Sequence, residues 1–494
     1  MTQDIQLTDE QQDLISADFK QGELVKVIAF AGTGKTFTLV EVARRLERDH
    51  PDWKILYLAF NKSIQEEAGA KFPPNTEART THSLAYQSVG SKYRHKLVYD
   101  LKVKELSDIL DLPRKNFMLV KYAVDTLKNY LNSADRLIVN IHCPGIEHKH
   151  SAYVHKVEVV ELAKKLWKGM CDVDNHVVGM THDGYLKLFQ LEGKELPYHA
   201  VFFDECQDAN PVTTDIVLQQ RHALRVLVGD PHQQIYSFRG AVNAIDRVQA
   251  DRTYYLTGSF RFGDDFANVA NILLTEFKNE RQDLHGLSGT GVLEKVDTEQ
   301  PHAVLSRTNA GLFDEAAGLF KGKKLGFLGG IQGYRFSNIL DVYHLSHGMQ
   351  QRVQSRYLKR FEDIEDLQDF ADEMEDAELM SLLKTVEKYG KEVPSLIANI
   401  EKSTVKGLSK ANVLLATTHK AKGFEFKRVK MKDDFTDFFE EKDKRKFPET
   451  IPRDEINLYY VAATRAKECL QINRKFKRIL SYLNKKYDNY TLPF

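Results

Sequence analysis

Short apolar runs alternate with amphipathic stretches along this chain, and this pattern predicts a parallel α/β protein. The run from Leu24 to Phe30 is apolar and rich in β-branched residues, and Thr36 to Leu46 has helical spacing without Gly or Pro. A second apolar run, Trp53 to Phe60, precedes another helical stretch, and Ala200–Phe203 and Arg225–Gly229 follow the same pattern. Strands that alternate with helices favour a parallel sheet, whose ligands lie at the carboxyl ends of the strands.

The second half of the chain repeats this alternation, which predicts a second α/β domain. Its expected strands are Tyr254–Thr257, Ala303–Arg307, Asn412–Ala416 and Cys469–Ile472. Two stretches with helical spacing interrupt the domains. We therefore predict a first domain over residues 1–92 and 175–252 with a helical insertion at 93–174, and a second domain over 253–336 and 411–494 with a smaller helical insertion at 337–410. The helices expected in the first insertion are Lys102–Leu110, Phe117–Leu131 and Val157–Met170.

The loop after the first apolar run reads IAFAGTGKT and has the composition of a phosphate-binding loop. Glycine lets the backbone wrap around an anion and point successive N–H groups at it. Lys35 is placed to reach the β- and γ-phosphates, and the Thr36 hydroxyl suits a Mg²⁺ ligand. The usual first Gly of this motif is Ala29 here, the smallest change available. We predict an ATP site with Mg²⁺, formed by Ala31, Gly32, Thr33, Gly34, Lys35 and Thr36; the alternative is a loop that only joins strand to helix.

An acidic pair, Asp204 and Glu205, directly follows the buried run Ala200–Phe203. Carboxylates at the end of a buried strand cost free energy unless something uses them. Beside a phosphate-binding loop, Asp204 would hold Mg²⁺ and Glu205 would polarise the attacking water. Gln233, after the strand Arg225–Gly229, is placed to sense the γ-phosphate. In the first amphipathic stretch, the Gln11 amide could read the edge of adenine, and a solvated helix residue is the alternative.

Aromatic and polar residues gather at the other expected strand ends. Phe60 and Asn61 follow the second strand, and Thr81 and His82 stand in a hydroxyl-rich segment after the next. Tyr236, Phe238 and Arg239 interleave rings and charge, which suits a stacked single strand of nucleic acid at ~1–3 kcal/mol per base.

Bulk charge adds nothing to this interpretation, because 70 basic and 70 acidic residues give the 494-residue chain a formal net charge of zero. A nucleic-acid partner must therefore bind to local basic patches on the surface. The first insertion is rich in Lys and His, and its basic surface fits either a solvated face or a face that binds the nucleic-acid backbone. The second is acidic, which fits a solvated face, a partner surface or a guard against DNA.

The four cysteines, Cys143, Cys171, Cys206 and Cys469, are far apart and form neither a CxxC pair nor a disulfide framework. Reduced thiols are the expected state, and zinc on His142, Cys143 and the nearby histidines at 148, 150 and 155 is an alternative with unsuitable spacing. Apolar runs stay well short of the ~18 residues that cross a bilayer, and the polar N-terminus is unlike a signal peptide. We expect a cytoplasmic protein with no membrane partner.

The order of these motifs resembles that of superfamily 1A helicases of the UvrD/Rep type, over nearly the whole chain from Gln11 to Arg465. The segments LAFNKSIQEEA, TTHSLAY and THDGYLKLFQ resemble, in amino-acid sequence, the helicase core of the F-box DNA helicases. No F-box segment precedes Leu7, so we expect no ubiquitin-ligase role, and a bacterial or viral origin fits. The two insertions resemble the 1B and 2B subdomains of that family, the latter much shortened.

The resemblance implies roles for individual residues. Gln11 would read adenine, Asp204, Glu205 and Gln207 would form the DExQ box, and Gln233 would sense the γ-phosphate. In the second domain, Phe260 would stack on adenine, Arg261 would contact the γ-phosphate, Gly423 and Glu425 would touch phosphate and ribose, and Arg465 would be an arginine finger. The implied DNA contacts are Phe60, Asn61, Thr81, His82, Tyr236, Phe238, Arg239, Arg307, Thr418 and His419.

The family implies an ATP-dependent motor that steps 3′ to 5′ along single-stranded DNA and separates duplex at its junctions with single strands. The alternative is a DNA-stimulated ATPase subunit or switch that gates a partner, such as a nuclease or a recombination factor, without unwinding alone. A nucleotide-binding scaffold is a third possibility, which Glu205 and Arg465 argue against because binding alone needs neither. RNA as the track is a weaker option.

Overall fold

The computed structural model divides the chain into two compact units, Met1–Thr257 and Gly258–Phe494. It describes residues 7–103, 106–107, 117–146, 150, 154–236, 243–289, 291–373, 377–439, 447 and 451–487. Each unit is an α/β structure on a parallel sheet, as the sequence pattern predicts.

The described part of the first unit holds a six-stranded sheet in the order β3-β2-β4-β5-β1-β6. All of its strand pairs are parallel. Its strands are β1 (Leu24–Ala29), β2 (Ile55–Ala59), β3 (Thr76–Thr80), β4 (Ala200–Phe203), β5 (Leu224–Gly229) and β6 (Arg252–Leu256). Because β1 and β4 both lie next to β5, the loops that follow these strands meet at one edge of the sheet.

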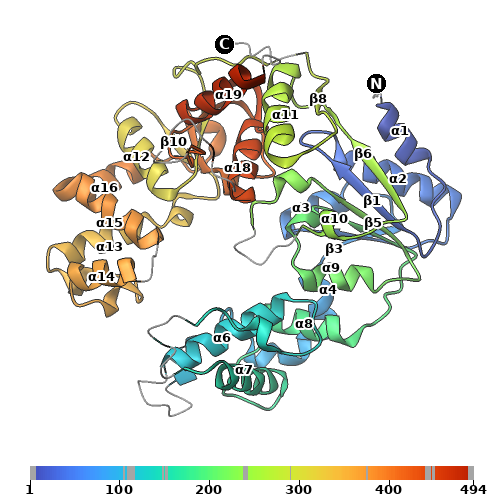
Figure 1. Ribbon diagram of the computed structural model, residues 1–494, viewed down its shortest axis with the longest axis horizontal. Coiled ribbons are helices and arrows are strands. Elements are labelled where there is room, and N and C mark those ends of the chain that lie inside the picture. The colour runs from blue at the N-terminus through green and yellow to red at the C-terminus, as the bar shows by residue number, and fades with distance from the viewer. Residues whose placement is uncertain are drawn as a thin grey trace. The chain divides into compact units, whose positions relative to one another are not determined.

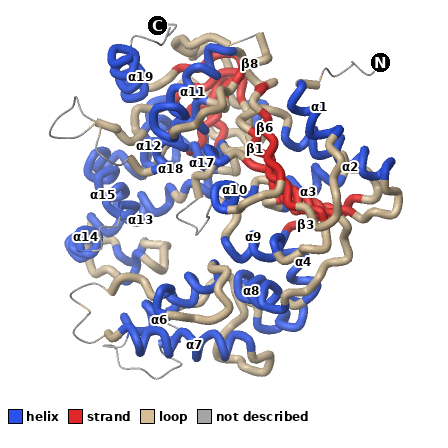
Figure 2. The backbone as a smooth tube through the Cα atoms, turned by 45° about the vertical axis from the view of Figure 1, so that its right-hand side comes forward, coloured by secondary structure: helices blue, strands red, loops and turns tan. Residues whose placement is uncertain are grey.

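Helices cover the sheet of the first unit and also form a separate layer beyond it. They are α1 (Asp9–Ser16), α2 (Lys35–Asp49), α3 (Lys62–Gly69), α4 (Thr81–Ser88), α6 (Phe117–Asn132), α7 (Lys156–Cys171), α8 (His182–Glu192), α9 (Pro211–Leu218) and α10 (Ala244–Arg247). Helices α6 and α7 run side by side, away from the strands of this unit (Figures 1 and 2). The predicted helices Phe117–Leu131 and Val157–Met170 are confirmed, and most of the third, Lys102–Leu110, lies outside the described residues.

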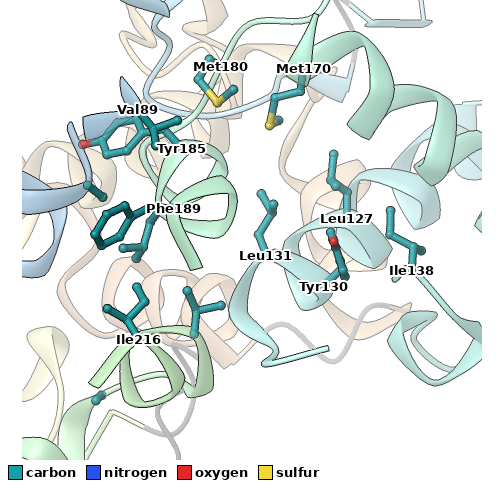
Figure 3. Packing of buried hydrophobic residues seen from close by; sticks show 14 of the residues in the cluster. Val89, Leu127, Tyr130, Leu131, Ile138, Met170, Met180, Tyr185, Phe189 and Ile216 are labelled. Carbon is teal, nitrogen blue, oxygen red and sulfur yellow. The ribbon is translucent and has the colours of Figure 1, made fainter. Parts of the chain in front are cut away.

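One apolar core joins the helical insertion to a face of the first sheet. Leu127 and Leu131 of α6 and Met170 of α7 belong to the same buried cluster as Phe189 of α8 and Ile216 of α9. Figure 3 shows these side chains within one packed region. The opposite face of the sheet has its own core, which includes side chains from α2. The strands read as nearly continuous apolar runs because both faces are covered.

The second unit contains, among its described residues, a five-stranded parallel sheet in the order β10-β11-β9-β12-β13 and a two-stranded pair, β7 and β8. The strands are β7 (Gly258–Ser259), β8 (His285–Gly286), β9 (His302–Ser306), β10 (Leu325–Phe327), β11 (Val413–Thr417), β12 (Phe426–Met431) and β13 (Ala466–Gln471). The helices are α11 (Asp264–Lys278), α12 (Asn309–Leu319), α13 (Phe336–Ser346), α14 (Ile364–Glu373), α15 (Ala377–Tyr389), α16 (Val393–Ser403), α17 (Thr418–Ala421), α18 (Arg453–Ala463) and α19 (Arg474–Tyr487). Helices α13 to α16 lie between β10 and β11, in the stretch where the sequence predicts the second helical insertion.

One strand differs from its expected place. The alternation of strands and helices predicts Tyr254–Thr257 in the second domain, whereas β6 pairs in parallel with β1 in the first sheet, with Val27 opposite Tyr254. The assignment of this strand to the second sheet was wrong. Apolar alternation identifies a strand but carries no information about which sheet the strand joins. In the structure, the Glu10 carboxylate accepts two hydrogen bonds from Thr257, at 2.6 and 2.8 Å, and these bonds hold the end of β6 to α1.

Candidate nucleotide and DNA sites

The loop between β1 and α2 has the backbone that its glycines allow. Gly32 and Gly34 adopt φ angles of 80° and 77°, a region that side-chain-bearing residues rarely occupy. Thr33 between them is buried, and its hydroxyl donates to the Phe30 carbonyl at 2.9 Å. Helix α2 begins directly after Gly34, without a side-chain cap. Its first N–H groups are therefore available to an anion at the helix start.

Lys35 meets the acidic pair at the edge of the sheet. Its Nζ lies 2.8 Å from Oε1 of Glu205. Burial disfavours the charge on Lys35, but the nearby carboxylates of Glu205, Asp204 and Asp230 outweigh burial and raise its pKa. Three carboxylates around one ammonium leave the site with surplus negative charge. The structure thus brings the phosphate-binding loop and the DExQ box together, as the sequence predicts.

Asp204 is buried, with 3% of its surface exposed. Its Oδ2 accepts a hydrogen bond from the Tyr57 hydroxyl at 2.6 Å, and its Oδ1 accepts one from the backbone N–H of Glu205 at 2.8 Å. Burial and the charge of Glu205 raise the pKa of Asp204, although Lys35 and the hydrogen bonds act in the opposite direction. A nearby cation would relieve this cost.

The residues at this edge fit a divalent metal such as Mg²⁺. The available donors, the Asp204 carboxylate and the Thr36 hydroxyl, are oxygen atoms, which hard cations prefer, and the site carries excess negative charge. Mg²⁺ commonly takes one or two protein oxygens together with phosphate oxygens and water, so a full protein cage is not required. Asp204 and Thr36 are the residues that would hold it.

Two glutamines and an aspartate order the loops around the acidic pair. Gln207 is fully buried, its Nε2 donates to Glu205, and its Oε1 accepts from the backbone N–H of Asp230 at 3.2 Å. The buried Asp230 in turn accepts a hydrogen bond from Nε2 of Gln233 at 2.7 Å. Glu205 itself has φ 51°, a conformation that costs a non-glycine residue free energy and is common at functional sites.

Gln11 is buried against the phosphate-binding loop. Its Nε2 donates to Thr38 Oγ1 of α2 at 3.0 Å and lies 3.4 Å from the Thr33 carbonyl oxygen. Its Oε1 accepts from the backbone N–H of Thr8, which closes a capping box at the start of α1. The amide is therefore engaged with the phosphate-binding loop and the start of α2, and adenine recognition stays a prediction.

Two predicted DNA-binding aromatic residues of the first unit lie together. The rings of Phe60 and Tyr236 are nearly parallel, with centroids 6.1 Å apart and planes inclined by 15°, and Phe60 is 43% exposed. Asn61 caps α3 by accepting a hydrogen bond from the Ile64 N–H at 3.0 Å. Phe238 and Arg239 lie outside the described residues, so their predicted roles in DNA binding stay predictions.

The other predicted DNA contacts of this unit, Thr81 and His82, open helix α4. Thr81 is buried, while His82 lies near the surface with its Nε2 3.3 Å from Oδ1 of Asp183. Of the two, His82 is the side chain that solvent and ligands can reach. Both roles stay predictions.

In the second unit, Arg261 and Glu425, two of the predicted nucleotide-binding residues, form a polar cluster. Arg261 donates to Glu425 at 3.0 Å and to the Thr464 carbonyl at 2.7 Å. Glu425 also pairs with Lys467; although burial opposes its ionisation, these two cations lower its pKa. Gly423 adopts φ 84°, and Phe260 is 44% exposed.

Arg465 belongs to the same cluster but is almost fully buried. Its guanidinium donates to the carbonyls of Val461 at 3.0 Å and Phe424 at 3.3 Å, and to the Thr464 hydroxyl at 3.1 Å. In this conformation, the predicted arginine finger is held by its own unit.

The predicted DNA contacts of the second unit lie near one another as well. Arg307 forms a forked pair with Glu455, whose Oε1 lies 2.8 and 3.1 Å from its Nη2 and Nε. Thr418 is buried and its hydroxyl donates to the Ser306 carbonyl at 3.3 Å. His419 follows in α17; burial opposes ionisation of Glu455, but Arg307, Thr436 and His419 lower its pKa. These roles stay predictions.

Sequence reasoning missed Tyr57 and the position of Asp230. Tyr57 fits the β-branched and aromatic composition of a strand, so its hydroxyl gave no separate signal, whereas Asp230 directly follows a buried strand and could have been found as Asp204 was.

Among the described residues, no three His, Cys, Asp or Glu side chains form a metal-binding group, and His148 of the zinc alternative lies outside these residues. All four cysteines are free thiols. In the same part of the chain, no helix is both long and apolar enough to span a bilayer.

Fold and site together define an α/β P-loop protein with RecA-like sheets and helical insertions. A family profile described as an AAA domain matches residues 11–239. F-box DNA helicase 1 of Gallus gallus is 36% identical over 97% of this chain and 50% of its own length. F-box DNA helicase protein 1 of Schizosaccharomyces pombe is 31% identical over 94% of this chain and 57% of its own length.

The chain contains a UvrD/Rep-like helicase core, which is similar to that of the F-box DNA helicases. It spans about half the length of the curated relatives it matches.

Proposed function

We propose that this chain is an ATP-dependent motor that moves 3′ to 5′ along single-stranded DNA and separates duplex at its junctions with single strands. The observation that carries the proposal is the cluster of Lys35, Asp204 and Glu205 at the edge of the first sheet, beside the phosphate-binding loop. Both relatives are named DNA helicases, which supports DNA as the track.

The Lys35–Glu205 pair suggests how the site would respond to a nucleotide. Oε1 of Glu205 faces Lys35, and its Oε2 accepts from Gln207. When Lys35 turns to the β- and γ-phosphates, Oε1 becomes available to accept a proton from the attacking water, while Gln207 keeps the carboxylate in place. Bound Mg²⁺, held by Asp204 and Thr36, would neutralise charge on the phosphate oxygens.

The second unit would supply the arginines of the reaction. Arg261 and Arg465 would act on the γ-phosphate, and Phe260 would stack on the adenine, with Gly423 and Glu425 at the phosphate and ribose. Arg465 must exchange its backbone partners for a phosphate oxygen, so its role requires a change of conformation within its unit. Gln233, held by Asp230, would report the presence of the γ-phosphate to the adjacent Tyr236 segment.

The DNA track would pass the exposed Phe60 ring and its partner Tyr236, where bases can stack. A DNA-stimulated ATPase that gates a protein partner without unwinding alone is the second candidate, since the Lys35–Glu205 site accounts for ATP hydrolysis and not for strand separation.

Unwinding assays on duplexes with a 3′ or a 5′ single-stranded tail test the proposal. We expect ATP-dependent strand separation of the 3′-tailed duplex only, and none with Glu205→Gln. The control Glu66→Gln removes an exposed carboxylate of α3 and should unwind normally. Unwinding from the 5′ tail would overturn the direction, and DNA-stimulated hydrolysis without strand separation would favour the second candidate.

A further inference from the structure

Tyr57 brings a hydroxyl from strand β2 to the acidic pair that follows β4. It stands opposite Phe202 in the parallel pairing of these strands, and its hydroxyl donates to Oδ2 of Asp204 at 2.6 Å. The residue is completely buried, and its ring packs against Phe72 with centroids 4.6 Å apart. The ring is thus fixed by its surroundings, and the hydroxyl has little freedom to follow a moving carboxylate.

Both oxygens of Asp204 are held by donors from different parts of the sheet. The Glu205 N–H reaches Oδ1 from the same loop, whereas the Tyr57 hydroxyl reaches Oδ2 from the neighbouring strand. Two donors on opposite oxygens define the plane of the carboxylate. Each oxygen accepts one bond here and keeps a lone pair for a further partner.

We propose that Tyr57 is a positioning residue for the divalent metal: its hydroxyl holds the Asp204 carboxylate in the orientation that accepts Mg²⁺. The inference rests on the proposed function, in which Asp204 is the metal-holding carboxylate. Partners that orient a metal-ligating side chain typically contribute about 10- to 100-fold to metal affinity. Tyr57 makes β2 part of the metal site, although the strand carries none of the metal's own ligands.

A packing role alone makes a different prediction. The ring contacts of Tyr57 do not involve its hydroxyl, so Tyr57→Phe keeps the packing and removes only the hydrogen bond to Asp204. A matched control is Tyr93→Phe, because Tyr93 is also buried in the first unit and its hydroxyl donates to the Cys171 carbonyl at 2.8 Å, in the helical insertion.

The experiment measures binding of a fluorescent, non-hydrolysable ATP analogue to the full chain over a series of MgCl₂ concentrations and in EDTA. For Tyr57→Phe, we expect the Mg²⁺ concentration for half-maximal binding to rise about tenfold, with unchanged affinity in EDTA. Tyr93→Phe should keep the Mg²⁺ dependence of the wild type. Thermal unfolding of both variants shows whether each remains folded.

Three outcomes would overturn the proposal: an unchanged Mg²⁺ dependence in folded Tyr57→Phe, an equal loss of affinity with and without Mg²⁺, or the same shift in Tyr93→Phe. A wild-type chain that binds no analogue at any Mg²⁺ concentration would instead contradict the proposed function itself.

Discussion

At the residue scale, the site depends on side chains that leave almost no free space. Gln207 links Glu205 to Asp230, and it lies directly against the Cα of Gly229, the last residue of β5. A Cβ at this glycine would come within 2.1 Å of Oε1 of Gln207 and 2.9 Å of Ile245. Glycine is required here by the close approach of a buried amide.

Gly229→Ala tests this contact. Because Gln207 is buried and cannot move into solvent, we expect the variant to lose ~1–3 kcal/mol of stability, as overpacked cores do, and to hydrolyse ATP more slowly as Glu205 loses its orientation. Thermal unfolding and steady-state ATP hydrolysis measure the two effects. The control is Gly69→Ala in α3, where a Cβ meets nothing within 4 Å. Wild-type stability and activity in Gly229→Ala would refute the contact.

Phe60→Ala tests the aromatic pair. Removal of a 43% exposed ring should leave ATP binding unchanged and weaken the affinity for single-stranded DNA by ~1–3 kcal/mol, the usual worth of one stacked base. Fluorescence anisotropy of a labelled oligonucleotide measures this change. Leu287→Ala removes a similarly exposed apolar side chain from the second unit and should bind DNA normally. Equal affinities for Phe60→Ala and wild type would exclude the stacking role.

At the element scale, two buried lysines hold the ends of the helices in the first insertion. Nζ of Lys187, from α8, donates to the carbonyls of Ser133 and Asp135 just beyond the end of α6. Nζ of Lys96 donates to the carbonyls of Gly169 and Asp172 at the end of α7. Cations at helix C-termini satisfy the last carbonyls and complement the helix dipole. Lys96, which belongs to the basic composition of the insertion itself, therefore serves its internal structure.

The pKa of Lys187 gives the first unit a measurable pH dependence. Burial lowers this pKa from the usual 10.5 to about 8. Between these values the folded chain has released the proton and the unfolded chain still holds it, so the unfolded state binds more protons and stability rises with pH. We expect the stability of wild type relative to Lys187→Met to increase from about pH 8 to 10.5.

Chemical denaturation at several pH values measures the difference in stability between the two proteins. The contributions of ionisable groups that both proteins share cancel in this difference. The control is Lys164→Met, whose exposed ammonium pairs with Glu161 on the surface of α7. A stability difference that does not change with pH would show that Lys187 has an ordinary pKa in the folded chain.

The sequence predicted elements better than it predicted their partners. The run Leu24–Phe30 and the stretch after Gly34 were foreseeable as strand and helix because apolar spacing and glycine positions are local properties. Placement of Tyr254–Thr257 failed because membership of a sheet is a long-range property. The Tyr57 hydroxyl was missed for the same reason: its partner Asp204 is 147 positions away.

At the scale of the whole molecule, the chain has two α/β units, and the predicted reaction groups are divided between them. Lys35, Asp204 and Glu205 belong to the first, and Arg261 and Arg465 belong to the second. The proposed hydrolysis uses groups from both units, so a substitution in either unit should slow it.

Arg465→Lys tests the contribution of the second unit. Lysine keeps a positive charge but lacks the planar fork of donors, so we expect nucleotide binding to persist and hydrolysis to fall by about 10³-fold, at the lower end for lost arginine fingers. The readouts are analogue binding and ATP turnover. Arg474→Lys, which alters a surface pair with Asp433, is the matched control. Normal turnover in Arg465→Lys would remove this residue from the reaction.

Steady-state ATP hydrolysis by the purified chain, with and without single-stranded DNA, tests the proposed motor most directly, with Lys35→Ala as the inactive control. The predicted result is Mg²⁺-dependent hydrolysis that single-stranded DNA stimulates strongly and that Lys35→Ala abolishes. Hydrolysis that DNA does not change would contradict the DNA track, and turnover retained in Lys35→Ala would contradict the ATP site.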